Sequence, residues 1–76
     1  MRIAMVELMR LMAEDIVAEE AFAIEFAREA EQADHMGDPA TADIMRDLSR
    51  RHRVKGLESI GRLAAMQFRY ATMFDR

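Results

Sequence analysis

Apolar residues recur every three or four positions over almost the whole chain, which predicts two long helices. The periodicity runs over residues 2–36 and again over residues 39–74, and it matches the turn of an α-helix. No stretch of the sequence alternates apolar and polar residues in the way a half-buried strand does. The pattern predicts an all-α protein whose two helices are each about 50 Å long.

A tight turn is predicted at residues 37–38. Gly37 suits the position just after a helix end, where a positive φ is needed. Asp38 suits the N-cap of the second helix, and Pro39 suits its first turn. Because the stop and the start are so close, we expect an antiparallel two-helix hairpin that forms one domain over residues 1–76.

Each predicted helix carries apolar residues on more than one side. On the first helix we expect a main face of Met5, Leu8, Met9, Met12, Ile16, Ala23, Phe26, Ala30 and Ala33, beside a smaller strip of Val6, Val17 and Ile24. On the second we expect one face of Ile44, Met45, Leu48, Leu63, Met66, Tyr70, Met73 and Phe74, and another of Val54, Leu57, Ala64 and Phe68. A lone hairpin would leave the second strips in water, which monomers avoid. The sequence therefore predicts self-association into a four-helix bundle, as a dimer or a larger homo-oligomer.

The composition excludes some classes of protein. A chain of 76 residues has a thin core and usually relies on disulfides, a metal or oligomerisation. It has no cysteine, and its net charge of −3 is not that of a nucleic-acid-binding protein. Charged residues interrupt the apolar N-terminal stretch, which argues against a membrane span and a signal peptide. We expect a cytoplasmic protein without nucleic-acid or membrane partners, and a protein partner remains open.

Two titratable residues fall in the middle of the predicted apolar faces. Glu19 lies on the main face of the first helix with Asp15 one turn before it. His52 lies on the face of the second helix, with Gly56 and Ser59 as its neighbours there. A buried carboxylate is costly unless it is paired or binds a metal. Counting outwards from the turn places Glu19 near His52. The two form either a structural pair or, with Asp15 and the copies in a dimer, a site for iron, zinc or manganese.

The stretch EEAFAIEFAREAEQADHMGD, residues 19–38, resembles the ligand helix and turn of ferritin-like proteins, rubrerythrins in particular. The family's ligand Glu, aromatic residue, alanines and glycine are matched here by Glu19, Phe26, Ala30, Ala33 and Gly37. The family's next helix carries Glu-x-x-His, whereas the matching positions here are His52 and Lys55. A protonated lysine is a poor ligand. The resemblance implies a ferritin-like half-bundle with a mononuclear site, or with a site that has been lost.

The stretch HRVKGLESIG, residues 52–61, resembles the phosphorylated motif of histidine phosphotransfer domains. The resemblance implies that His52 accepts the phosphoryl group, that Lys55 supports it and that Gly56 leaves room for a partner domain. Gly61 falls about one residue early against this motif. A phosphotransfer histidine must face solvent, whereas the helical pattern places His52 on the apolar side.

Three functions therefore stay open from the sequence. The first is a small ferritin-like protein with Glu19, His52 and Asp15 as metal ligands. The second is a phosphotransfer module that uses His52 with Lys55. The third is a scaffold or interaction protein without chemistry, whose exposed apolar strip docks a partner helix. Whether the chain is an enzyme is undecided at this point.

Overall fold

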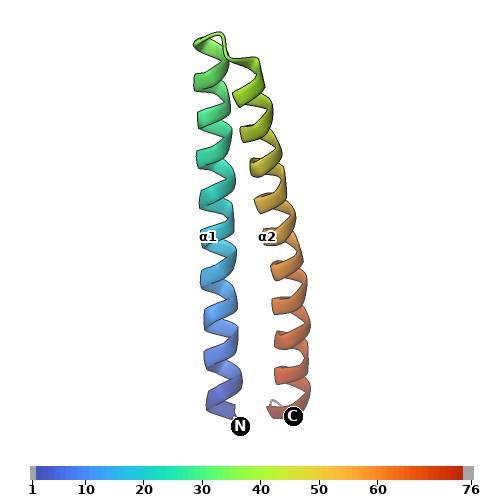
Figure 1. Cartoon of the computed structure of the whole chain (residues 1–76). Helices are drawn as coiled ribbons and strands as arrows, with labels where there is room; N and C mark the ends of the chain where they lie inside the picture. Colours follow the sequence, from blue (N-terminus) through green and yellow to red (C-terminus); the bar gives the residue numbers. More distant parts are fainter. Residues whose placement is uncertain (1, 75–76) are drawn as a thin grey trace.

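The computed structural model describes residues 2–74 and consists of two helices, α1 (Arg2–His35) and α2 (Pro39–Phe74). They run antiparallel and side by side, so that the turn lies at one end and both chain ends lie at the other (Figure 1). The hairpin measures 58 × 15 × 13 Å. The all-α hairpin is as predicted, with α1 ending one residue early, at His35. Residues 1 and 75–76 of the expected domain lie outside the described residues.

The turn has the geometry that its residues predict. Gly37 has a φ of +74°, in the left-handed region that glycine enters without a steric penalty. The Gly37 amide donates to the Asp34 carbonyl over 3.1 Å, and the Asp38 amide donates to the Ala33 carbonyl over 2.9 Å. These two bonds form a Schellman C-cap. The Asp38 carboxylate then accepts a bond of 3.1 Å from the Thr41 amide and so caps α2.

The helices meet along a seam whose residues are spaced alternately by three and four positions. On α1 the seam consists of Met5, Met9, Met12, Ile16, Glu19, Ala23, Phe26, Ala30 and Ala33, and on α2 of Ala42, Met45, Ser49, His52, Gly56, Ser59, Leu63, Met66 and Tyr70. This spacing is the heptad pattern of a coiled coil. The fully buried positions are all small: Ala23, Ala30, Ala33, Ala42, Ser49, Gly56 and Ser59. Small side chains are what allow two helices to approach closely.

The seam of α2 differs from the face that the sequence predicted. Ile44 and Met73 were expected there, but they are 59% and 51% exposed. The seam passes instead through Ala42 and Ser49, whereas Gly56 and Ser59 lie in it beside His52, as expected. The expectation weighed hydrophobicity, whereas two closely packed helices select for small size. On α1 the predicted face is the observed seam, apart from Leu8, which is exposed.

Large apolar side chains remain uncovered on the hairpin. Within the described residues none is fully buried, and the exposed ones are Ile3, Val6, Leu8, Leu11, Val17, Phe22, Ile24, Met36, Ile44, Val54, Leu57, Ile60, Phe68 and Met73. The second strips predicted for both helices belong to this set, apart from Ala64, which is a small residue and is also exposed. Neither α1 nor α2 contains an apolar stretch that is long enough to cross a membrane.

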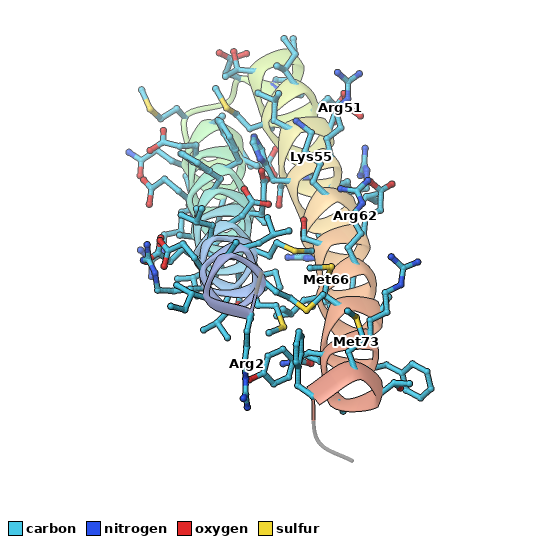
Figure 2. All side chains as sticks on the ribbon, turned by 90° about the horizontal axis from the view of Figure 1, so that it is seen from below. Arg2, Arg51, Lys55, Arg62, Met66 and Met73 are labelled. Carbon is cyan, nitrogen blue, oxygen red and sulfur yellow. The ribbon has the colours of Figure 1, made fainter. Side chains whose placement is uncertain are left out.

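At the open end of the hairpin, the start of α1 and the last turns of α2 are joined by a polar contact. Arg2, at the start of α1, reaches towards the last turns of α2 (Figure 2). Its Nε donates to the Tyr70 hydroxyl over 2.9 Å. Its guanidinium carbon lies 5.6 Å from the centre of the Tyr70 ring and 5.4 Å from that of Phe74, within the range of a cation–π contact. The helices therefore stay paired as far as their ends.

Candidate functional site

Glu19 of α1 and His52 of α2 meet at the middle of the seam. The His52 Nδ1 lies 2.5 Å from the Glu19 Oε2, and the two side chains are 21% and 15% exposed respectively. The rings of Phe22 and Phe26 lie 5.1 and 5.4 Å from the imidazole. A carboxylate only accepts hydrogen bonds, so Nδ1 donates and Nε2 is left as the second ring nitrogen. The contact that the sequence predicted between these residues is present.

Small residues make room for this pair. A Cβ built on Gly56 would lie 3.6 Å from the Glu19 Cβ, so the α2 backbone passes directly beside Glu19. One turn before His52, the Ser49 hydroxyl donates to the Ala23 carbonyl over 2.7 Å. Within residues 2–74, no buried side-chain nitrogen or oxygen lacks a hydrogen-bond partner. The polar centre of the seam therefore leaves no fully buried polar atom unpaired.

Asp15 lies one turn from Glu19 but does not join the pair. Its Oδ2 accepts a hydrogen bond of 3.0 Å from the Ser59 hydroxyl. Asp15 was expected near Glu19 and His52, and its bond to Ser59 was not predicted. A serine hydroxyl is a suitable donor to a carboxylate, and the place of Ser59 on the inner face of α2 could have indicated it. Asp15 and Ser59 therefore form a separate polar contact across the seam.

The residues of a single hairpin do not fit a metal ion. Zinc sites usually have three or four protein ligands, and in the described part of the chain no three of the residues His, Cys, Asp and Glu converge. The seam neighbours of His52 on α2 are Ser49 and Gly56, while Lys55 is exposed. Glu19 and His52 supply two ligands, and any others would have to come from a second chain.

The residues of the phosphotransfer motif are separated by the fold. His52 lies in the seam against Glu19, whereas Lys55 is exposed on α2 and has no hydrogen bond or ion pair among the described residues. Gly56, which the motif would use to leave room for a partner domain, is buried against Glu19. The only ring nitrogen of His52 that remains for chemistry is Nε2.

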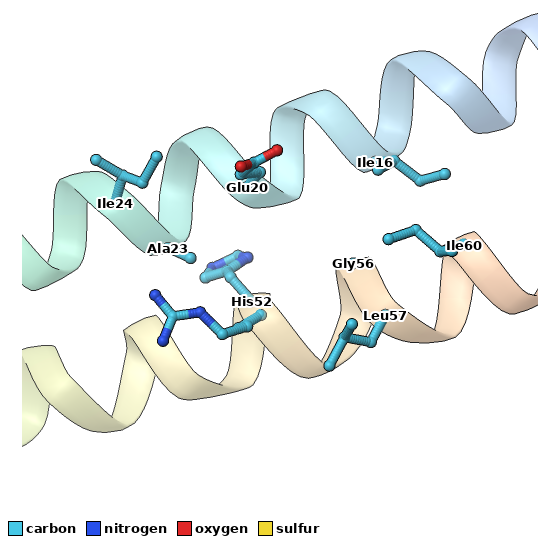
Figure 3. A pocket seen from close by; sticks show the side chains of 9 residues that line it. Ile16, Glu20, Ala23, Ile24, His52, Gly56, Leu57 and Ile60 are labelled. Carbon is cyan, nitrogen blue, oxygen red and sulfur yellow. The ribbon is translucent and has the colours of Figure 1, made fainter.

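A groove opens on one side of the seam, next to His52 (Figure 3). Its lining includes Ile16, Glu20 and Ile24 from α1 and His52, Leu57 and Ile60 from α2, with Arg53 also contributing. Neither Glu20 nor Arg53 has an ion-pair or hydrogen-bond partner within the described residues. The sequence predicted Ile24 and Leu57 on separate secondary strips. It did not predict that the antiparallel pairing brings these two residues to the same groove.

The two helices carry opposite charge. α1 contains nine acidic residues and three arginines, whereas α2 contains three acidic residues and seven basic ones. One ion pair, between Asp34 and Arg46, joins the helices near the turn. Exposed pairs of this kind contribute little to stability. The opposite charges matter more for what each helix attracts from outside.

No protein-family model, curated protein or solved structure matches this chain. Function is therefore inferred from the seam, the groove and the charges of the hairpin itself.

Proposed function

We propose that the protein is a self-associating structural module, in which two hairpins pair into a four-helix bundle. One observation carries this proposal: among the described residues only Ala, Ser and Gly are fully buried, while many large apolar side chains are exposed. Such a seam leaves a 76-residue chain with little of the burial that a domain of this size needs. A second hairpin provides the missing layer.

The magnitudes favour association. Covering one Val, Leu or Ile side chain gains about 1.5–3 kcal/mol. The loss of translational and rotational freedom on association costs about 4–15 kcal/mol. The exposed residues include Val17, Ile24, Leu57 and Ile60, which are 44–67% exposed, so covering each of them gains about half of the amount for a whole side chain. A symmetric dimer covers two copies of each residue, and the summed gain is comparable with the middle of the range of the association cost.

In this proposal the Glu19–His52 pair sets the alignment of the helices and has no catalytic role. If α2 moved by one heptad along α1, Glu19 would face Met45 or Ser59 instead of His52. A carboxylate against a methionine would lose its hydrogen bond in a mostly buried place, which is costly. A polar pair that fixes register is a recognised use of buried polar residues in helical bundles.

Sedimentation equilibrium of the untagged chain tests the proposal. We expect a species of twice the 8.8 kDa chain mass, and a urea unfolding midpoint that rises with protein concentration, because folding and association are linked. A chain that is monomeric at micromolar concentration, with the same midpoint at every concentration, would contradict it.

Metal binding is a second candidate, favoured by the direct contact between Glu19 and His52. Two hairpins in one bundle hold two such pairs, and carboxylate and imidazole are suitable ligands for iron, zinc or manganese. A native mass spectrum before and after treatment with a chelator decides this. Loss of a metal-sized mass from the dimer, absent in the Glu19→Ala variant, supports it. A metal-free dimer rejects it.

Phosphotransfer is the alternative that uses the same histidine. It requires the Nε2 of His52 to be reachable from outside the seam, with the Nδ1 held by Glu19. Incubation with a phosphorylated receiver domain, or with acetyl phosphate, should then give acid-labile phosphate that is lost in the His52→Gln variant. If His52 stays unmodified, this alternative is excluded.

A further inference from the structure

We propose that the second copy docks on the groove side of the hairpin, with the two-fold axis parallel to the helices. α1 of each copy then lies against α2 of the other, and both turns lie at the same end of the bundle. The inference rests on the proposed self-association and adds the face and the orientation. We define the groove face as Val17, Glu20 and Ile24 of α1 together with Arg53, Leu57 and Ile60 of α2.

The groove face carries apolar residues of both helices around one opening. Figure 3 shows Ile24, Leu57 and Ile60 around the same opening. Val17 lies one heptad before Ile24 and is 67% exposed. On the opposite side, the heptad positions next to the seam include Asp15, Lys55, Arg62 and Arg69, whereas on the groove face they include Glu20 and Arg53. A second copy on the groove face covers the apolar residues of both helices and meets these two charges.

The charges select the orientation. An axis parallel to the helices places the acidic α1 against the basic α2 of the other copy. An in-plane axis perpendicular to the helices would place α1 against α1 and α2 against α2. Helices with nine acidic residues and three arginines repel each other in that second arrangement, and charge complementarity fixes which surfaces pair.

The register follows from the contacts within one hairpin. Asp15 lies level with Ser59, and Glu19 lies level with Gly56. Val17 is therefore level with Leu57, and Glu20 is close to the level of Arg53. A two-fold axis parallel to the helices leaves every residue at the same height along the bundle in both copies. Val17 of one copy then meets Leu57 of the second, and Glu20 meets Arg53, two charges that have no partner within the described part of a single chain.

Disulfide crosslinking tests this arrangement, because the chain has no cysteine of its own. Two single variants, Val17→Cys and Leu57→Cys, are oxidised separately and as an equal mixture. In the proposed arrangement only the mixture gives a covalent dimer, joining position 17 of one copy to position 57 of the other. If either variant crosslinks efficiently to itself and the mixture adds nothing, the axis is the perpendicular one and the proposal is overturned.

A matched pair on the opposite side provides the control. Leu11→Cys and Arg62→Cys lie at corresponding levels there, and their mixture should stay monomeric on denaturing gels. Crosslinking of this pair in place of the first would overturn the choice of face. Sedimentation of the unmodified chain separates the two conclusions. A dimer with the wrong crosslinks leaves the proposed function standing, whereas the absence of a dimer removes both.

A charge reversal gives an independent measurement. Glu20→Arg and Arg53→Glu should each weaken the dimer several-fold in Kd, because each places like charges opposite one another in the two symmetric contacts. The double variant restores the opposite pairing and should recover most of the affinity. If both single variants associate as tightly as the unmodified chain, the two charges do not face each other and the register is wrong.

Discussion

The half of the hairpin near the turn and the half near the chain ends bury their seams to different degrees. In the turn half, residues 23–49, five of the seam positions are fully buried, and all five are Ala or Ser. In the terminal half, residues 2–16 and 60–74, the seam consists mainly of Met, Ile, Leu and Tyr. None of these residues is fully buried, although they are the larger and more apolar ones.

The difference shows that the larger side chains of a two-helix seam are not the better buried ones. Ala and Ser are covered completely by a single facing helix. Met and Leu extend beyond the line between two helix axes, so further helices are needed to surround them. Methionine, with three rotatable bonds, also adapts to whichever surface covers it. The turn half is nearly complete in one chain, and we expect the terminal half to gain most from assembly.

The largest expected effect comes from a large side chain in the turn half. Ala30 is 2% exposed, so Ala30→Phe must push the helices apart. We expect a loss of about 3 kcal/mol in the free energy of unfolding, at the upper end of the usual cost of overpacking. Urea unfolding followed by circular dichroism at one fixed protein concentration measures it.

Met12→Phe in the terminal half is the matched control. It replaces one large apolar side chain by another of similar volume at a partly exposed seam position. Such exchanges usually cost less than about 1.5 kcal/mol. Equal losses for Ala30→Phe and Met12→Phe would show that the two halves are packed alike.

The polar centre between the two halves should give the next largest effect. Glu19→Ala and His52→Ala each leave a mostly buried polar group without its partner, and we expect each to cost about 2 kcal/mol. The double variant should cost clearly less than the two single losses combined, because the second substitution removes a group that is already unpaired. Purely additive losses, measured by urea unfolding, would mean that the contact contributes nothing specific.

A smaller, stabilising effect is expected in the terminal half from Gly61→Ala. A Cβ at Gly61 meets nothing within 4 Å, so alanine should stabilise the helix by about 1 kcal/mol through its higher propensity. Gly56→Ala has the same advantage, but its Cβ would lie 3.6 Å from the Glu19 Cβ, an ordinary contact distance. Thermal unfolding of both variants compares the two sites. A loss of stability at Gly61 would indicate a neighbour that covers it.

The smallest effect concerns pH at the turn. Hydrogen bonds from the Thr41 hydroxyl and amide lower the pKa of Asp38 below its usual value. A lowered pKa in the folded state means that the cap stabilises the fold above the unfolded-state pKa and stops doing so as the pH falls through the folded-state pKa. Asp38→Ala should therefore lower the melting temperature slightly at about pH 7 and hardly at all at about pH 2. If Asp38→Ala lowers the melting temperature equally at both pH values, the stabilisation does not come from the ionised carboxylate of Asp38.

The turn was predictable from the sequence because glycine, aspartate and proline each have a specific backbone preference. The α1 seam was predictable because its apolar residues coincide with it. The α2 seam was predictable only in part: Gly56 and Ser59 were expected beside His52, but Ala42 and Ser49 are small and a search for a large apolar face passes over them. The contact between Glu19 and His52 followed from their places in the middle of the two predicted faces and from their distances to the turn. The groove required knowing how far each helix is rotated about its own axis, which sequence periodicity does not give.

The contact between Arg2 and Tyr70 holds the beginning and the end of the chain together. If two copies pair with their turns at the same end, the last helix of one copy ends near the first helix of the next. A linker of a few residues would then join two copies into a single up-down-up-down chain. With the turns at opposite ends, the same linker would have to span the 58 Å length of the hairpin, or roughly 17 extended residues. The pairing thus sets whether two such hairpins joined in tandem form a single-chain bundle with short loops.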